Sequence, residues 1–190
     1  MISEFRRLLR DPDVRSISRR YFISNGFDGT LTSIGIVVGS FLGGTETAMG
    51  IVRIVVGGTV GLAASGLWSV WEIERAEKRA DLQRIEAQML TDLSNTALTD
   101  DRTAARKVNA AMSGLGPTIG MLVPVVPFLF VGAGLPLGWA AAAGVGLGVA
   151  LLFVFGAYMG ELSEQDWVYA GLRTALVGLL VGAINVVLPG

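Results

Sequence analysis

Cysteine and histidine are both absent from this chain of 190 residues. Without cysteine, disulfides and thiolate metal sites are excluded. Without histidine, the chain lacks the commonest general base and the commonest transition-metal ligand. A metal would have to bind carboxylate, amide, carbonyl, methionine sulfur or water ligands, which suit Mg, Ca, Mn and Fe(II) better than Zn or Cu. Because the sequence also has no phosphate-binding glycine loop, we expect neither an enzyme nor a bound cofactor.

Charged residues are also scarce. They make up 16% of the chain, against about 25% in typical soluble domains. The net charge of −1 gives no electrostatic reason to expect nucleic-acid binding. By contrast, 52% of the residues are hydrophobic, the mean hydropathy is +0.58 and glycine occurs 26 times. Glycine is frequent in membrane helices, where it lets backbones approach closely. This composition predicts a helical membrane protein.

The apolar runs predict an all-α integral membrane protein with five transmembrane helices, since a run of about 20 apolar residues spans a bilayer. Pro124 and Pro127 predict a kink or break in the third helix. The second helix is followed by 71–90, which has no glycine or proline and is rich in helix formers, so we expect it to continue into the cytoplasm. The five predicted helices cover about 21–44, 50–70, 112–131, 137–159 and 167–188.

The chain then divides into four parts. They are a cytoplasmic amphipathic segment (1–20), transmembrane helices 1 and 2 (21–72), a cytoplasmic helical insertion (73–111) and transmembrane helices 3 to 5 (112–190). Residues 1–20 are charged and do not resemble a cleavable signal. Of the 15 Lys and Arg residues, all but Arg53 and Arg173 lie in the first or third part. The positive-inside rule places both parts in the cytoplasm and the C-terminus outside.

Asp28 is the most informative single residue, because it lies at the start of a stretch with no other charge up to Gly44. A carboxylate in a membrane helix costs several kcal/mol unless it is paired, hydrated or metal-bound, and such residues mark ion or proton pathways. Its spacing from Gly35 predicts that it points towards a packed helix. The structural alternatives are a helix N-cap or an ion pair with Arg19, Arg20 or Arg173.

A second candidate lies on the polar continuation of the second helix. Glu74, Glu77 and Asp81 are spaced i, i+3 and i+7, so they share a face that could gather divalent cations at the membrane surface. Basic residues interleave with them, and a solvated helix with internal ion pairs explains the same pattern without a site. Met89, Met112 and Met121 offer soft ligands, although methionine more often fills packing gaps.

Several blocks of the sequence resemble the vacuolar iron transporter family, whose members move Fe(II) or Mn(II) out of the cytosol. Residues 25–29 (NGFDG) resemble the opening helix of the family, with its membrane Asp-Gly pair. Residues 66–82 resemble the end of the second helix and the start of the cytosolic metal-binding helix. Residues 121–128 resemble the third helix with its Pro-x-x-Pro, and 171–173 with Gly178 resemble the start of the fifth.

The resemblance implies a homodimer that exports Fe²⁺ or Mn²⁺ in exchange for protons. Asp28 would be the ligand in the membrane, and Glu74, Glu77 and Asp81 would collect metal on the cytoplasmic side. Two expected ligands are missing, because Ala63 and Leu67 stand where the family has Met and Glu. The compact chain favours a prokaryotic cell membrane. Two alternatives remain open, a membrane scaffold that does not transport and a transporter of another small solute.

Overall fold

The computed structural model describes residues 12–89 and 97–187, and this part of the chain is entirely helical. Residues 1–11 of the predicted amphipathic segment (1–20) lie outside the described residues. In chain order the elements are α2 (Pro12–Leu42), α3 (Ala48–Met89), α4 (Ala97–Leu122), the 3₁₀ helix η1 (Val123–Ala133), α5 (Leu137–Leu162) and α6 (Trp167–Val187).

The turns between helices follow local sequence chemistry. Helix α2 ends before Gly44, which has φ +83°, a conformation that glycine adopts without steric cost. Thr47 then caps α3 by accepting a hydrogen bond from the backbone N–H of Gly50 at 3.1 Å. Asp166 caps α6, since its Oδ1 accepts hydrogen bonds from the N–H groups of Val168 and Tyr169 at 2.8 and 3.1 Å.

The helix boundaries differ from the predicted ones in two places. Helix α2 begins at Pro12 rather than near residue 21, because the preceding polar residues continue the same helix. Helix α4 (Ala97–Leu122) runs without interruption through Pro117, so the end of the predicted cytoplasmic insertion (73–111) and the start of the predicted third membrane helix (112–131) form one helix. The predicted proline break is confirmed, since α4 gives way to the 3₁₀ helix η1 at Val123.

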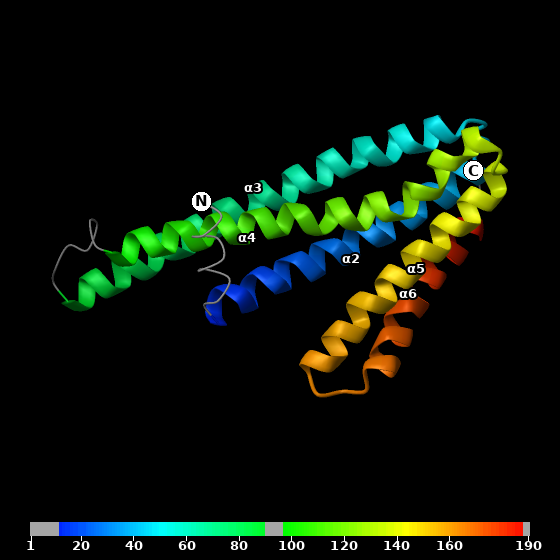
Figure 1. Cartoon of the computed structure of the whole chain (residues 1–190). Helices are drawn as coiled ribbons and strands as arrows, with labels where there is room; N and C mark the ends of the chain where they lie inside the picture. The colour runs from blue at the N-terminus through cyan, green and yellow to red at the C-terminus, as the bar shows by residue number, and fades with distance from the viewer. Residues whose placement is uncertain (1–11, 90–96, 188–190) are drawn as a thin grey trace.

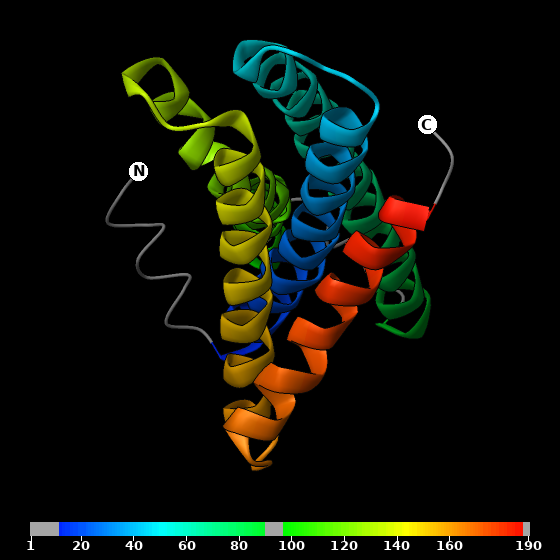
Figure 2. The same ribbon diagram turned by 90° about the vertical axis from the view of Figure 1, so that its right-hand side faces the viewer.

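Helix α2 lies at the centre of the molecule and contacts α3, α4, α5 and α6. Figure 1 shows α3 and α4 as a long pair on one side of α2, with the α5–α6 hairpin on the other. The hairpin packs near the C-terminal end of α2 and diverges from its N-terminal end. The view in Figure 2 shows the same hairpin, with α2 passing between the other helices.

Four of the helical segments are long and apolar enough to cross a membrane: Ala48–Ile85, Ala105–Ala133, Leu137–Leu162 and Trp167–Val187. The prediction of membrane helices is confirmed for these four. Helix α2 is not among them, since it carries polar residues such as Thr30 and Ser33, which are fully buried. Because α2 is surrounded by other helices, it can carry polar groups that a lipid-facing helix could not.

Candidate functional site

Asp28 lies near the middle of α2 and is exposed in the single chain. Among the described residues its carboxylate forms no hydrogen bond or ion pair, so the alternatives of an N-cap and of a pair with an arginine receive no support. The prediction that Asp28 points towards a packed helix is wrong within one chain. Gly35 does face α6, at Asn185, whereas Asp28 is exposed even though α5 contacts α2 close by, through Phe155 beside Gly26.

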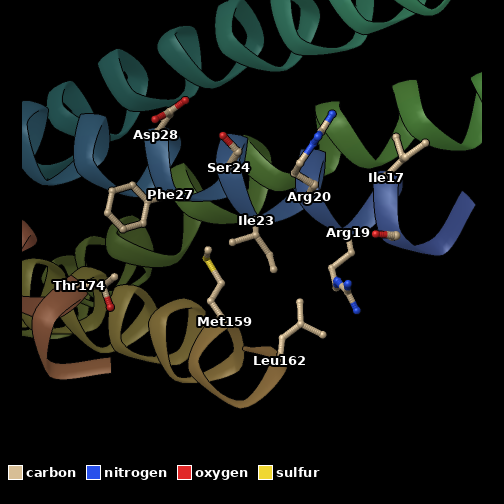
Figure 3. Close-up of a pocket in the computed structure, with 11 residues that line it drawn as sticks. Ile17, Arg19, Arg20, Ile23, Ser24, Phe27, Asp28, Met159, Leu162 and Thr174 are labelled. Carbon is tan, nitrogen blue, oxygen red and sulfur yellow. The ribbon is translucent and has the colours of Figure 1, made fainter. Parts of the chain in front are cut away.

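A cavity of about 640 Å³ lies beside this part of α2. Asp28 lines it together with residues from α2, α5 and α6. In Figure 3, Arg20, Ser24 and Asp28 project from one side of α2, at successive four-residue steps. Met159 and Leu162 of α5 lie on the other side of α2. The arrangement gives α2 one polar stripe ending in an unpaired carboxylate and one apolar side facing α5.

Asn25, three residues before Asp28, has hydrogen-bond partners of its own on α4. Its Nδ2 donates hydrogen bonds to Oγ and O of Ser113, at 2.5 and 3.3 Å. The Ser113 hydroxyl in turn donates to the carbonyl of Gly66 at 2.8 Å. Asn25 therefore ties α2 to α4 and α3 rather than standing beside Asp28 as a second free ligand.

Glycine sets the distance between α2 and α4 next to Asp28. A Cβ on Gly29 would come within 2.7 Å of the Pro117 Cα, and one on Gly116 would overlap the Phe22 carbonyl oxygen. Neither contact can be relieved by a flexible side chain, because both partners are main-chain atoms. The backbone that carries Asp28 is thus held directly against the backbone of α4.

Glu74 is buried, with 6% of its surface exposed, at the junction of α2, α3 and α4. Its Oε1 accepts hydrogen bonds from Asn109 Nδ2 at 3.1 Å and from the Tyr21 hydroxyl at 3.5 Å. Lys78 lies 3.6 Å from its Oε2. Asn109 is itself fixed, because the Ser18 hydroxyl donates to its Oδ1 at 2.7 Å. A charged carboxylate can be buried when it is paired and hydrogen-bonded in this way.

Glu77 and Asp81 are exposed, unlike Glu74. Asp81 lies 3.9 Å from Arg84, and both side chains are more than half exposed. Within residues 12–89 and 97–187 no three acidic side chains come close enough together to hold a metal ion. One chain therefore does not bring Asp28, Glu74, Glu77 and Asp81 together, and their role as ligands stays a prediction.

Ala63 and Leu67, where the resemblance led us to expect metal ligands, are residues of α3 that lie next to α4. The Ala63 carbonyl and the Leu67 side chain are both close to Gly114, at 3.3 and 3.5 Å from the place of a Cβ there. Met121 is fully buried in an apolar cluster with Ile51, Val55 and other residues, which fits a packing role. Met112 lines a second cavity, and the side chain of Met89 is outside the described residues.

Sequence reasoning missed the partners of Glu74, above all Asn109, Ser18 and Tyr21. A signal for the α2–α4 contact was present, because polar and small residues recur at three- and four-residue steps along both helices. On α4 they are Asn109, Ser113, Gly116 and Gly120, and on α2 they are Gly26, Gly29 and Ser33, with Ser18 two turns before Asn25. Such stripes indicate a close helix pair.

Two comparisons with known proteins bear on this arrangement. The model of the VIT family matches residues 69–188, which extend from the middle of α3 to the end of the described part of α6. A relative from Methanocaldococcus jannaschii, described as "Uncharacterized protein MJ0645", is 23% identical over 168 residues. The match covers 87% of this chain and 85% of the relative. Since the family model covers more than half of the chain, the protein belongs to the VIT family, the vacuolar iron transporters, and is an integral membrane protein of a metal-transporter family.

Proposed function

We propose that this protein exports divalent metal, Fe²⁺ or Mn²⁺, from the cytoplasm in exchange for protons. The observation that carries the proposal is Asp28, a carboxylate exposed on the central helix and without a partner among the described residues. An unpaired carboxylate at membrane depth is costly unless it binds a cation or a proton. The carboxylate of Asp28 offers a hard oxygen ligand, which suits Fe²⁺ and Mn²⁺.

The proposed transporter works as a homodimer, in which α3 meets its copy. The window of α3 that could span the membrane is the least covered of the four, with 17% of it buried within the chain. Gly57 and Gly61 form a small-xxx-small pair on α3, and a Cβ at either would have nothing within 4 Å. By contrast, the glycines of α2 at 35 and 39 already face Asn185 of the same chain. An unused glycine pair on an apolar helix supports contact with a second helix.

The proposed orientation places the N-terminus and the polar half of α3 in the cytoplasm, and the C-terminus outside, in a prokaryotic cell membrane. Helix α3 has 42 residues, about 63 Å at 1.5 Å per residue, against a hydrocarbon core of about 30 Å. Its second half would thus leave the bilayer on the side that holds most of the arginines and lysines. There the exposed carboxylates of Glu77 and Asp81 would gather metal, with contributions from both chains of a dimer.

Unlike the sequence-based prediction, this proposal does not use Glu74 as a metal ligand. Its two carboxylate oxygens already face Asn109, Tyr21 and Lys78. A metal ion would have to displace these groups. We therefore propose that Glu74 holds α2, α3 and α4 together. In this proposal the exposed residues Glu77 and Asp81 collect the metal.

The direct test is the thermal stability of the purified protein against Fe(II), Mn(II), Co(II), Ca(II) and Mg(II), with Asp28→Asn beside the wild type. A ligand at a hundredfold excess over Kd stabilises the folded state by about 2.7 kcal/mol. A shift selective for Fe(II) or Mn(II) and lost in Asp28→Asn supports the proposal. No shift with any metal would favour the two alternatives that Ala63 and Leu67 keep open, a scaffold without transport or a carrier of another small solute.

A further inference from the structure

The N-terminal half of α2 and the C-terminal half of α5 enclose a second cavity, of about 440 Å³. It shares Arg19 and Ile23 with the larger cavity beside Asp28, so the two are neighbours along α2. We call this second cavity the α2–α5 slot. Its volume lies within the range of about 300–1,000 Å³ that is typical of small-molecule sites.

The walls of the α2–α5 slot are chiefly apolar. Phe22 and Ile23 come from α2, and Val154 and Phe155 come from α5. The Phe22 and Phe155 rings meet edge to face with their centroids 6.1 Å apart, which fixes the relation of the two helices there. A ligand of this slot therefore needs an apolar portion.

Two arginines, Arg15 and Arg19, line the same slot one helical turn apart. Arg19 points from α2 to the side on which Leu162 of α5 lies (Figure 3). Neither arginine forms an ion pair within the described part of the chain. The acidic residues at the nearby end of the hairpin, Glu161 and Glu164, are exposed and do not pair with them. The slot thus combines apolar walls with two arginines that form no ion pair with another described residue.

From this geometry we propose that the α2–α5 slot binds an anionic phospholipid, with its phosphate at Arg15 and Arg19 and an acyl chain against Ile23 and Phe155. Arginine suits phosphate because its planar guanidinium donates paired hydrogen bonds. Basic pockets between membrane helices on the cytoplasmic side hold anionic headgroups. The proposal depends on the membrane orientation given above but not on metal transport, and lipid binding is measured independently of metal.

Charge also favours an anionic lipid over residues 1–11 of the chain as the group that fills the α2–α5 slot. Residues 1–11 contain Arg6, Arg7 and Arg10 against Glu4 and Asp11. With the α-amino group included, that segment is positive overall and would be repelled by Arg15 and Arg19. An anionic lipid is attracted by the same two charges.

The test is native mass spectrometry of the full-length protein in neutral detergent, titrated with phosphatidylglycerol or with phosphatidylcholine of the same acyl chains. Inorganic phosphate is the third ligand. The variant is Arg15→Gln with Arg19→Gln. The matched control is Arg79→Gln with Arg84→Gln, which removes two charges from the exposed part of α3. Val154→Trp, which narrows the slot and leaves both arginines in place, is a second variant.

We expect the wild type to bind phosphatidylglycerol more tightly than phosphatidylcholine. The loss should be about fivefold for each arginine removed, given the contribution of one basic residue near an anionic lipid. The control variant should bind as the wild type does, and Val154→Trp should bind more weakly. Equal affinity for the two lipids, or unchanged affinity in the Arg15/Arg19 variant, would overturn the proposal. Binding of inorganic phosphate as tight as that of the lipid would show an anion site instead. A wild-type protein that binds no phosphatidylglycerol would likewise overturn the proposal.

Discussion

Asn109 Nδ2 donates a hydrogen bond to Glu74 Oε1 across 3.1 Å, and both side chains are almost fully buried. This contact joins α4 to α3, while Ser18 and Tyr21 extend it to α2. Three consecutive helices thus meet at one carboxylate. The junction lies where α3 passes from its apolar half into its polar half, and it holds the central helix α2 against its two long neighbours.

Replacing Glu74 tests this junction. Glu74→Ala removes the acceptor of the buried Asn109 amide, and an unsatisfied buried group costs about 1–3 kcal/mol. For a chain of this size each kcal/mol corresponds to about 2–4 °C in the melting temperature. We expect Glu74→Ala to melt clearly lower than Glu77→Ala, whose side chain is exposed. Glu74→Gln, which keeps one acceptor for Asn109, should fall between them. Equal melting temperatures for Glu74→Ala and Glu77→Ala would contradict a structural role for Glu74.

The glycine contact between α2 and α4 gives a second prediction. Gly116→Ala would place a methyl group on the Phe22 carbonyl and force the two helices apart, at a cost of about 1–3 kcal/mol or more. Gly146→Ala on α5 adds the same methyl group where nothing lies within 4 Å. Thermal unfolding should separate the two variants, with only Gly116→Ala destabilised. A wild-type melting temperature for Gly116→Ala would mean that α2 and α4 are not in backbone contact.

The sequence predicted most of the helices but not the direction of the key side chains. Apolar runs, the prolines at 124 and 127 and Gly44 are local signals, and the elements they predict are present. The direction of Asp28 depends on where α6 leaves α2, which no spacing within α2 can reveal. The burial of Glu74 depends on Asn109, 35 residues further along the chain. Periodicity placed Glu74 and Glu77 on one face, although α4 covers only the first of them.

The proposed dimer predicts that bulky residues on the free face of α3 separate the subunits. Gly57→Leu with Gly61→Leu should give a monomer that is still folded, because nothing in the same chain occupies that space. Gly146→Leu, at an equally open position of α5, should stay dimeric. Light scattering of the detergent-purified variants gives the mass. A monomeric wild type, or a dimer unaffected by both glycine changes, would rule out this interface.

Metal collection on the cytoplasmic side is tested with the exposed acids. Glu77→Ala with Asp81→Ala should weaken binding of Mn²⁺ in calorimetric titration, since these carboxylates are free to reach a cation. Glu161→Gln with Glu164→Gln removes the same charge from the exposed end of the α5–α6 hairpin and should leave the affinity unchanged. If both double variants bind Mn²⁺ as the wild type does, Glu77 and Asp81 are surface charges that take no part in metal binding.

The central claim is that Asp28 carries the metal across the membrane. The most direct measurement is the flux of Mn²⁺ or Fe²⁺ across proteoliposomes with an imposed proton gradient, for the wild type, Asp28→Asn and Glu46→Gln. Glu46 is an exposed acid in the turn between α2 and α3 and serves as the control. We predict flux in the wild type and in Glu46→Gln, and its loss in Asp28→Asn while the protein keeps its fold and mass. Flux that persists in Asp28→Asn would contradict the account.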